Sequence, residues 1–199
     1  VEAKPAFGYR FGEWQETGTT VPAITVPLPG ALTRTAVFEA VPPPEITINE
    51  IHYNPYATQG DDAVYEFIEL VNTGDQAVDL SGFSLTGVTF TFPDGATIAK
   101  DEIIVLAATA VTYAGLPVQV FQWTSGSLSN NSATVTLLDA SGNVIDTVTY
   151  DDEAPWPTEP DGNSGSSLAL LDLALDNSLA ASWAASAEVG GTPGAVNFP

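Results

Sequence analysis

The sequence predicts an all-β fold, either a β-sandwich or a β-barrel of short strands. Apolar segments of strand length recur about every 8 to 15 residues between positions 45 and 150. Turn-forming sequences separate them, among them NTGD (72–75), PDG (93–95) and SNNS (129–132). Hydrophobic residues make up 44% of the chain, which is enough for a core, and no helical period of useful length appears.

From residue 45 onward the strands follow one another closely. Gly142-Asn143 lies between two apolar runs and predicts a hairpin turn. Leucines between positions 168 and 175 alternate mostly with period two, which favours a final strand and then a loop over a helix. The strands before it are expected at 45–53, 65–72, 78–87, 89–93, 102–108, 119–123, 134–139 and 144–150.

Residues 1–43 differ from the rest and are too few to close a core alone. Two short strands, within 19–28 and 32–41, are expected around the turn dipeptide Pro29-Gly30, and the prolines after Val41 form a stiff spacer. The segment could be the last hairpin of an upstream domain, pack on the main domain, or add as strands to a neighbouring molecule. We therefore divide the chain into an extension at 1–43 and a domain at 44–199.

Charge is the outlying property of the composition. Four Lys and Arg residues face 25 Asp and Glu residues, for a net charge of −21. Such a chain is repelled by phosphate groups, which disfavours nucleic acid and anionic membranes, whereas divalent cations prefer carboxylate ligands. Cysteine is absent, which excludes disulfides and thiolate chemistry, and no apolar run is long enough to span a membrane. Methionine is also absent, even at position 1, as expected of a processed or excised chain.

Several longer segments carry a family resemblance. They are INEIHYNP (48–55), YEFIELVNTGDQAVDLSGFSL (65–85), FTFPDGATIAKDEIIVLAA (90–108), SGSLSNNSATVTLLDASGNVIDTVTYDD (125–152), WPTEPDGNSGSSLAL (156–170) and GTPGAVN (191–197). Together they resemble the lamin-tail domain of bacterial extracellular proteins, over about residues 45–197. The resemblance implies an immunoglobulin-like antiparallel β-sandwich, with EFIEL in a core strand. It implies a module of secreted or surface proteins with no established activity of its own.

One feature departs from the family. Lamin tails that associate with chromatin have a basic surface, whereas this chain is strongly acidic. The resemblance therefore does not imply nucleic-acid binding for this chain.

Glu66 and Glu69 lie in an apolar run and raise the question of catalysis. Residues three apart in a strand point to opposite faces, so the two cannot converge by themselves. The favoured interpretation places one on the solvent face and one near a sheet edge or at a position that binds the backbone. The alternative pairs one of them with Glu50 on an adjacent strand, where the two carboxylates would repel unless a cation or a shared proton intervened.

His52 is the only histidine, so any Ser-His-Asp triad would have to use it, and no nucleophile-elbow motif is present. We expect His52 in an exposed or hydrogen-bonded loop. The tryptophans at 14, 123, 156 and 183 would form a carbohydrate platform only if exposed side by side, and core packing or loop anchoring is favoured.

Acidic loops are the best candidates for a specific ligand. Calcium takes six to eight oxygen ligands from flexible loops, but the complete EF-hand pattern is missing here. A solvated loop with Asx-turns is favoured, and calcium is the alternative. The candidate ligands are Asp61, Asp62, Asp151, Asp152, Asp161 and Asn163.

The sequence therefore predicts a non-catalytic, extracellular or cell-surface structural and interaction module without catalytic residues or a required cofactor. Its partners are expected to be proteins or further copies of itself, through strand addition by the N-terminal segment. A calcium-dependent adhesion or carbohydrate-binding module of a secreted enzyme is the alternative. A hydrolase would need carboxylates converging in a cleft.

Overall fold

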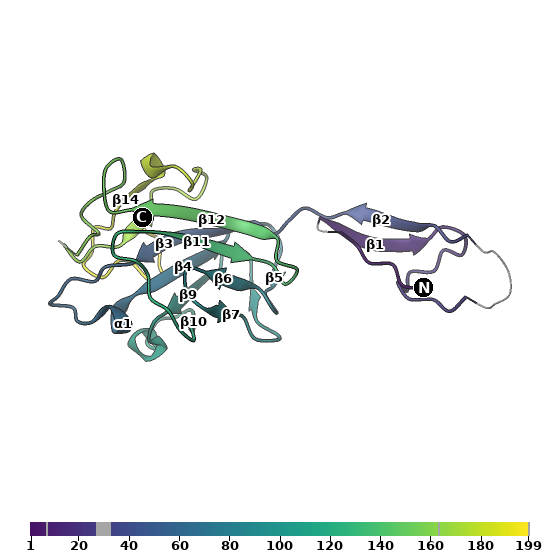
Figure 1. The fold of residues 1–199 in the computed structure, drawn as a ribbon, viewed down its shortest axis with the longest axis horizontal. Helices are drawn as coiled ribbons and strands as arrows, with labels where there is room; N and C mark the ends of the chain where they lie inside the picture. Colours follow the sequence, from purple (N-terminus) through teal and green to yellow (C-terminus); the bar gives the residue numbers. More distant parts are fainter. Residues whose placement is uncertain (7, 27–32, 163, 199) are drawn as a thin grey trace. The chain divides into compact units, whose positions relative to one another are not determined.

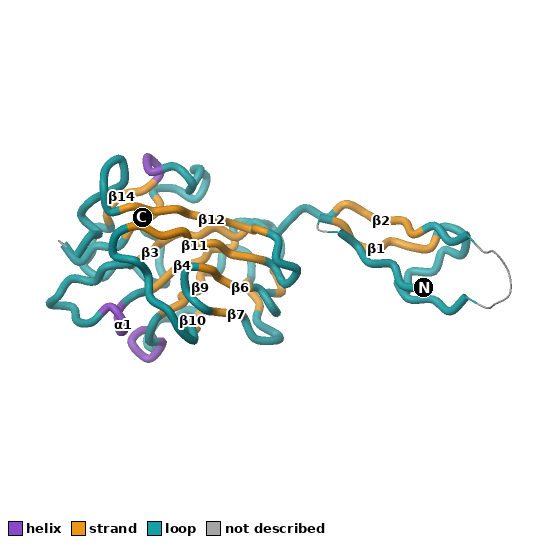
Figure 2. The backbone as a smooth tube through the Cα atoms, viewed as in Figure 1, coloured by secondary structure: helices purple, strands orange, loops and turns teal. Residues whose placement is uncertain are grey.

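The computed structural model describes residues 1–6, 8–26, 33–162 and 164–198. The chain divides into two compact units, Val1–Pro43 and Pro44–Pro199, and each is described by itself. Strands supply nearly all of the regular structure in both units (Figures 1 and 2). Among the described residues, no helix is long and apolar enough to cross a membrane.

The N-terminal unit is built on a two-stranded antiparallel sheet, here called the ribbon, formed by β1 (Tyr9–Trp14) and β2 (Ala36–Ala40). Strand β2 falls within the strand predicted at 32–41. The strand predicted at 19–28 was wrong, because β2 pairs with residues 9–14 instead. The described part of 19–28 contributes only isolated bridges, such as Trp14 with Thr19. The Pro29-Gly30 turn lies outside the described residues.

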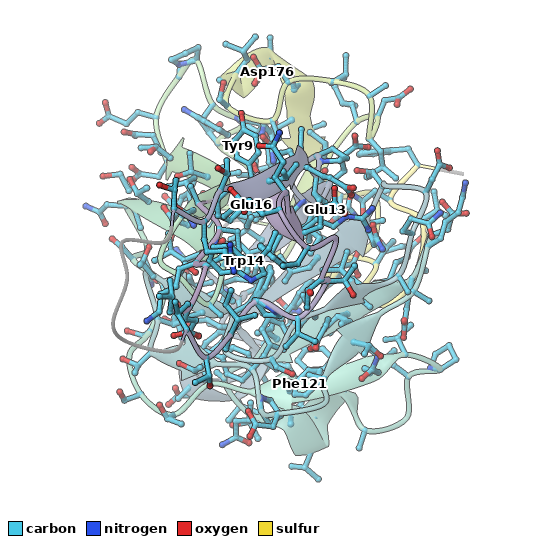
Figure 3. All side chains as sticks on the ribbon, turned by 90° about the vertical axis from the view of Figure 1, so that its right-hand side faces the viewer. Tyr9, Glu13, Trp14, Glu16, Phe121 and Asp176 are labelled. Atoms are coloured by element: carbon cyan, nitrogen blue, oxygen red, sulfur yellow. The ribbon has the colours of Figure 1, made fainter. Side chains whose placement is uncertain are left out.

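A small aromatic cluster holds the ribbon together. Trp14 is almost fully buried, and its indole nitrogen donates a hydrogen bond to the Val21 carbonyl (3.1 Å). The Phe11 ring lies 5.6 Å from that of Trp14 and 6.1 Å from that of Phe38. Figure 3 labels Trp14 together with Tyr9, Glu13 and Glu16 of the same unit. The tryptophan therefore serves packing, as favoured from the sequence.

The second unit is an immunoglobulin-like β-sandwich, which confirms the predicted fold class. Its larger sheet has the order β10-β9-β4-β3-β13-β14 and its smaller sheet the order β12-β11-β6-β7, with β5 and β8 as a separate pair. The larger sheet comprises β3 (Ile46–His52), β4 (Phe67–Asn72), β9 (Ile103–Ala107), β10 (Gln119–Gln122), β13 (Leu168–Leu170) and β14 (Trp183–Ala185). The smaller comprises β6 (Ser84–Thr86), β7 (Phe90–Thr91), β11 (Ser132–Leu138) and β12 (Val144–Asp151).

Short elements complete the domain. They are the pair β5 (Val78–Asp79) and β8 (Thr97–Ile98), the helix α1 (Asp62–Tyr65), and the 3-10 helices η1 (Ala110–Tyr113) and η2 (Ala180–Ser182). The predicted strand at 78–87 is interrupted because the chain turns at Gly82, whose φ of 75° is favourable only for glycine. The strands β8 and β14 were not predicted. Both are too short to show a period.

The core lies between the two sheets. It contains Ile48, Ile51, Ile68, Leu70, Ile104 and Leu106 from the larger sheet, and Leu85, Phe90, Val135, Leu137, Val148 and Tyr150 from the smaller. Tyr53 stacks on Tyr150 with ring centroids 4.6 Å apart. Alternate residues of each strand point into this layer, as the two-residue period of a strand requires, except in β3, where a bulge between Ile48 and Glu50 places the core residues Ile48 and Ile51 three apart.

The outer face of the larger sheet is also covered, and this was not predicted. Phe67, Val105 and Ala107 form a second buried cluster beneath Tyr113 and the residues that follow it. Every residue of β4 is consequently buried. Side chains that the strand period directs away from the core are therefore also buried from solvent.

Candidate functional site

Glu50 and Glu69 meet on the covered outer face of the larger sheet. They are register partners on the antiparallel strands β3 and β4, next to a bulge at Asn49, and both are 0% exposed. The expectation of a solvent-facing glutamate was therefore wrong, because Glu66 and Glu69 are both buried. The expected backbone-binding position is confirmed, since each accepts a hydrogen bond from a main-chain amide. The alternative pairing with Glu50 across adjacent strands is confirmed.

A segment near the C-terminus, residues 188–198 and here called the strap, covers the pair. The Thr192 amide donates to Glu50 Oε1 (2.9 Å) and the Gly194 amide donates to Glu69 Oε2 (2.7 Å). Ser167 Oγ also donates to Glu50, and Asn49 Nδ2 donates to Glu69 Oε1 (2.6 Å). The carboxyl oxygens thus anchor the main chain of the strap by hydrogen bonds.

The approach of the strap is close enough to require glycine. Gly191 has a φ of +74°, and a Cβ built on it would lie 2.2 Å from Glu50 Oε1. Any other residue would both strain the backbone and collide with the carboxyl group. The glycine of the GTPGAVN motif is therefore explained by this contact.

Burial controls the ionisation of the pair. Desolvation, and then the charge of Glu50, raise the pKa of Glu69 to about 8, and desolvation raises the pKa of Glu50 as well. No basic side chain is among the hydrogen-bond partners described for either residue. Because two like charges side by side in a dry site are not both stable, we infer that the pair retains a proton at neutral pH.

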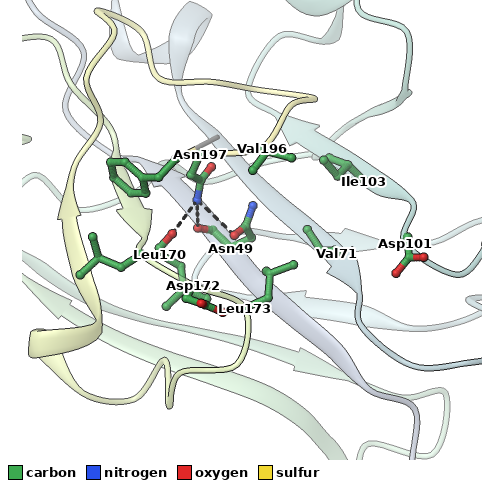
Figure 4. Close-up of a pocket in the computed structure, with 11 residues that line it drawn as sticks. Asn49, Val71, Asp101, Ile103, Leu170, Asp172, Leu173, Val196 and Asn197 are labelled. Atoms are coloured by element: carbon green, nitrogen blue, oxygen red, sulfur yellow. Dashed lines mark hydrogen bonds between the residues drawn. The ribbon is translucent and has the colours of Figure 1, made fainter.

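Two asparagines connect this pair to a pocket. Asn197 Nδ2 donates to the main-chain oxygens of Asn49 (3.0 Å) and Leu170 (3.1 Å), and Thr192 Oγ1 donates to Asn197 Oδ1 (3.1 Å). The side chain of Asn49 bonds to both Asn197 and Glu69. These bonds fix the end of the strap against β3 and β13 (Figure 4).

The pocket encloses about 360 Å³ between the end of the strap and the outer face of the sheet. The carboxylates of Asp101 and Asp172 are at its lining, along with Asn49 and Asn197 (Figure 4). Its apolar lining consists of Val71, Ile103, Leu170, Leu171, Leu173, Val196 and Phe198. Sequence reasoning missed the pocket, because the strap and the 171–173 loop are distant in the chain from the strands they meet.

Glu66 is separate from the pair. It follows α1 directly, is buried, and its Oε2 accepts a hydrogen bond from the Leu128 amide (3.1 Å), while its Oε1 has no partner among the described residues. Desolvation, opposed by the Leu128 bond and reinforced by Asp62, raises its pKa to about 7. The prediction that Glu66 and Glu69 would not converge agrees with their separate sets of partners.

His52 does not lie in a loop, and that prediction was wrong. It is the last residue of β3, fully buried opposite Phe67, with ring centroids 5.6 Å apart. Desolvation lowers its pKa to about 4, so the ring is neutral at neutral pH. No hydroxyl nucleophile is among its described hydrogen-bond partners; Gln59 Nε2 lies 3.4 Å from its Nε2.

The acidic candidates for calcium are dispersed among turns. Asp61 caps α1 through the Ala63 amide (2.9 Å), and Asp151 accepts from the Glu153 amide (2.9 Å). Asp62 and Asp161 accept from the side chains of Asn130 and Asn54. Asp152 is half-buried, and Asn163 lies outside the described residues. In the described part of the chain, no three His, Asp or Glu side chains gather closely enough to hold a metal ion.

The remaining tryptophans serve packing. Trp123 and Trp183 are buried in the core, and Trp156 packs half-buried against Trp183 with ring centroids 6.2 Å apart. The described tryptophans therefore form no exposed platform of the kind that sugar binding would need.

The similarity of this chain to known proteins identifies a family. The family model described as the Lamin Tail Domain matches residues 39–152. A search of curated proteins finds no match. Among solved structures, a DUF4876 family protein from Bacteroides thetaiotaomicron is similar, at a TM-score of 0.46 and 11% identity, over 75% of this chain and 68% of that one.

Proposed function

Because the chain belongs to the lamin tail domain family, we propose that it is a non-catalytic, extracellular interaction module that associates with further copies of itself through its N-terminal ribbon. The association is strand addition, in which the open edge of β2 pairs with a strand of a second molecule. The carboxyl pair anchors the strap and takes no part in catalysis.

The exposure of β2 is the observation that carries this proposal. Four of its five residues are exposed, and Val37 and Phe38 retain 36% and 38% of their accessible surface. Among the described residues, β2 pairs only with β1. A strand with one open edge and exposed apolar side chains is a template for pairing with another chain, unless charge or proline protects it.

The distribution of charge favours contact through this unit. Residues 1–43 hold three of the four basic residues and four of the 25 acidic ones, a net charge of −1, which leaves −20 on residues 44–199. Two acidic domains repel each other, whereas a nearly neutral unit approaches an acidic domain without that penalty.

Analytical ultracentrifugation of full-length Val37→Lys tests the proposal. A lysine here faces Glu13 across the ribbon, so the ribbon itself should stay paired, while its edge gains a protective charge. We expect wild type to associate with rising concentration and Val37→Lys to remain monomeric. Val21→Lys adds the same charge at an exposed position outside β2 and should associate like wild type. A wild type that stays monomeric at all concentrations would exclude the proposal.

A further inference from the structure

We propose that β2 of one copy pairs with the open part of β12, residues 147–151, in the next copy. The two strands run antiparallel, and Phe38 lies opposite Thr149. This inference rests on the proposed function and names the strand that receives β2.

β12 is the longest strand at an edge of either main sheet. It has eight residues, whereas the other edge strands β10, β14 and β7 have four, three and two. In the described part of the chain it pairs only with β11 (Figure 1). It contains neither lysine nor proline, which commonly protect an open edge. Asp146 turns inward to the Ile48 amide, so residues 147–151 form the open part.

Alternate main-chain groups of β12 face this open edge. The Thr147 amide donates to Asp146 Oδ1 (2.8 Å), so it is turned away from β11. The Thr149 hydroxyl lies 2.8 Å from that of Thr134, an approach typical of the closer, non-hydrogen-bonded pairs of an antiparallel ladder. Beyond the β11 ladder, residues 147–151 form no main-chain hydrogen bond with one another or with other described main-chain groups. Residues 147, 149 and 151 therefore direct their main-chain N–H and C=O groups to the edge.

β2 presents a matching set of main-chain groups. The Val41 amide donates to the Gly8 carbonyl (2.8 Å), and the Gln15 amide donates to the Thr35 carbonyl (2.9 Å). Because main-chain groups alternate in direction along a strand, residues 35, 37, 39 and 41 face β1, and residues 36, 38 and 40 face the open edge. The open residues of β2 thus match 147, 149 and 151 in number and in spacing.

Charge selects the register of the two strands. Phe38 opposite Thr149 places Glu39 opposite Val148. A slip of two residues in one direction would place Glu39 opposite Asp146, and like charges directly opposite each other destabilise a strand pair. A slip in the other direction would leave the first open residue of β2 beyond the end of β12.

The same register brings a cation to the acidic turn that follows β12. Arg34 comes two residues before the first open residue of β2, and the β1–β2 ladder continues through Thr35, so Arg34 lies on the same face as that residue. The turn holds Asp151, Asp152 and Glu153, of which Glu153 is exposed. None of the ion pairs among the described residues involves Arg34 or this turn. Long side chains reach their diagonal neighbours in a sheet, so opposite charges meet at this end of the contact.

The full-length variant Thr149→Pro tests the receiving strand. Proline removes the amide hydrogen that faces the open edge and leaves the bonds to β11 in place. We expect this variant to stay monomeric in sedimentation equilibrium at concentrations where wild type associates. Thr149→Val keeps the amide hydrogen, so it is the matched control and should associate like wild type. Urea denaturation checks that both variants are folded.

A mixing experiment tests the direction of the contact. The ribbon of one copy binds the domain of the next, so the two surfaces differ and the contact is head-to-tail. Val37→Lys has a blocked β2 and an intact β12, and Thr149→Pro has the reverse. Each alone should be monomeric, whereas an equimolar mixture should form a heterodimer and nothing larger. A Thr149→Pro variant that associates by itself would instead indicate pairing of β2 with β2.

A charge exchange tests the register without proline. Arg34→Glu should weaken association about fivefold, because it sets an acid against the acidic turn. Adding Glu153→Lys to the same chain should restore much of the loss. The control Arg34→Glu with Glu159→Lys has the same net charge, with the lysine at an exposed position outside the turn, and should stay weak.

The outcomes separate this inference from the proposed function. If Val37→Lys is monomeric while Thr149→Pro and Arg34→Glu associate like wild type, β12 is not the receiving strand and the proposed function still stands. If proline at position 149 prevents folding, the charge exchange decides alone. If wild type never associates, both proposals fall.

Discussion

Glu50 and Glu69 lie opposite each other on adjacent strands, both without solvent exposure, and each accepts a main-chain hydrogen bond from the same C-terminal strap. Two acids thus serve as the attachment point of a chain segment more than a hundred residues away. Because the strap closes over them, they do not line an open cleft of the kind that a hydrolase needs.

The carboxyl pair predicts a fall in stability as pH rises. The pKa of Glu69 is about 8 in the folded protein against an ordinary value of 4.5, so between these values the folded state binds more protons than the unfolded state. The free energy of unfolding should therefore decrease from about pH 4.5 to about pH 8, at up to about 1.4 kcal/mol per pH unit. Urea denaturation across this range measures the slope.

The variant Glu69→Gln isolates this effect from the general repulsion of an acidic chain. It removes the titrating group, so its stability should depend less on pH than that of wild type. Its impaired hydrogen bond should make it less stable than wild type at the acidic end of the range, where Glu69 is protonated. Identical slopes in the two proteins would rule out Glu69 as the source.

Gly191 should not tolerate alanine. The substitution combines a left-handed backbone with a Cβ contact of 2.2 Å to Glu50, and we expect a loss of about 2 kcal/mol or more in the free energy of unfolding. Gly142→Ala is the control, since it has a similar φ of +85° and no atom within 4 Å of the added Cβ. Equal losses of stability in the two variants would mean that the collision with Glu50 adds nothing to the cost of the left-handed backbone.

Asp146 should be required to hold the two sheets together at one edge. Its Oδ2, on β12, accepts from the Ile48 amide at the β3 bulge (2.6 Å) and from Asn177 Nδ2 (2.7 Å). Asp146→Ala leaves these donors without their acceptor and should cost about 2 to 3 kcal/mol in chemical denaturation. Thr147→Ala, on the exposed face of the same strand, should cost under about 1 kcal/mol. A loss of that small size in Asp146→Ala would show that water replaces the carboxylate.

Calcium binding by the acidic loops stays the alternative to the solvated loops that the sequence favours. A ligand that binds only the folded protein raises its melting temperature by mass action. Thermal unfolding with and without millimolar calcium measures this, with magnesium as the control. A calcium-specific rise that disappears in Asp151→Asn, Asp152→Asn would support the site, and an unchanged melting temperature in wild type would remove it.

The strands of the domain could be predicted because each long strand alternates or is apolar throughout. The segment 45–53 became β3 and 144–150 became β12, with boundaries shifted by a residue or so. The ribbon was predicted less well, because residues 19–28 are as strand-like as residues 9–14 and only pairing distinguishes them.

The sequence by itself determined the positions of the longer strands and the resemblance to the family, since period and turn residues are local properties. It offered Glu50 only as an alternative partner for one of the two glutamates, because the order of strands within a sheet is not local. Whether the outward side of β4 meets water was decided only by tertiary structure. The residues after η1 and the strap fold over that face, and the burial of Glu50 and Glu69 beneath the strap raises the pKa of both carboxyl groups. No local pattern encodes a cover that comes from more than a hundred residues away, because the desolvation it imposes depends on three-dimensional proximity alone.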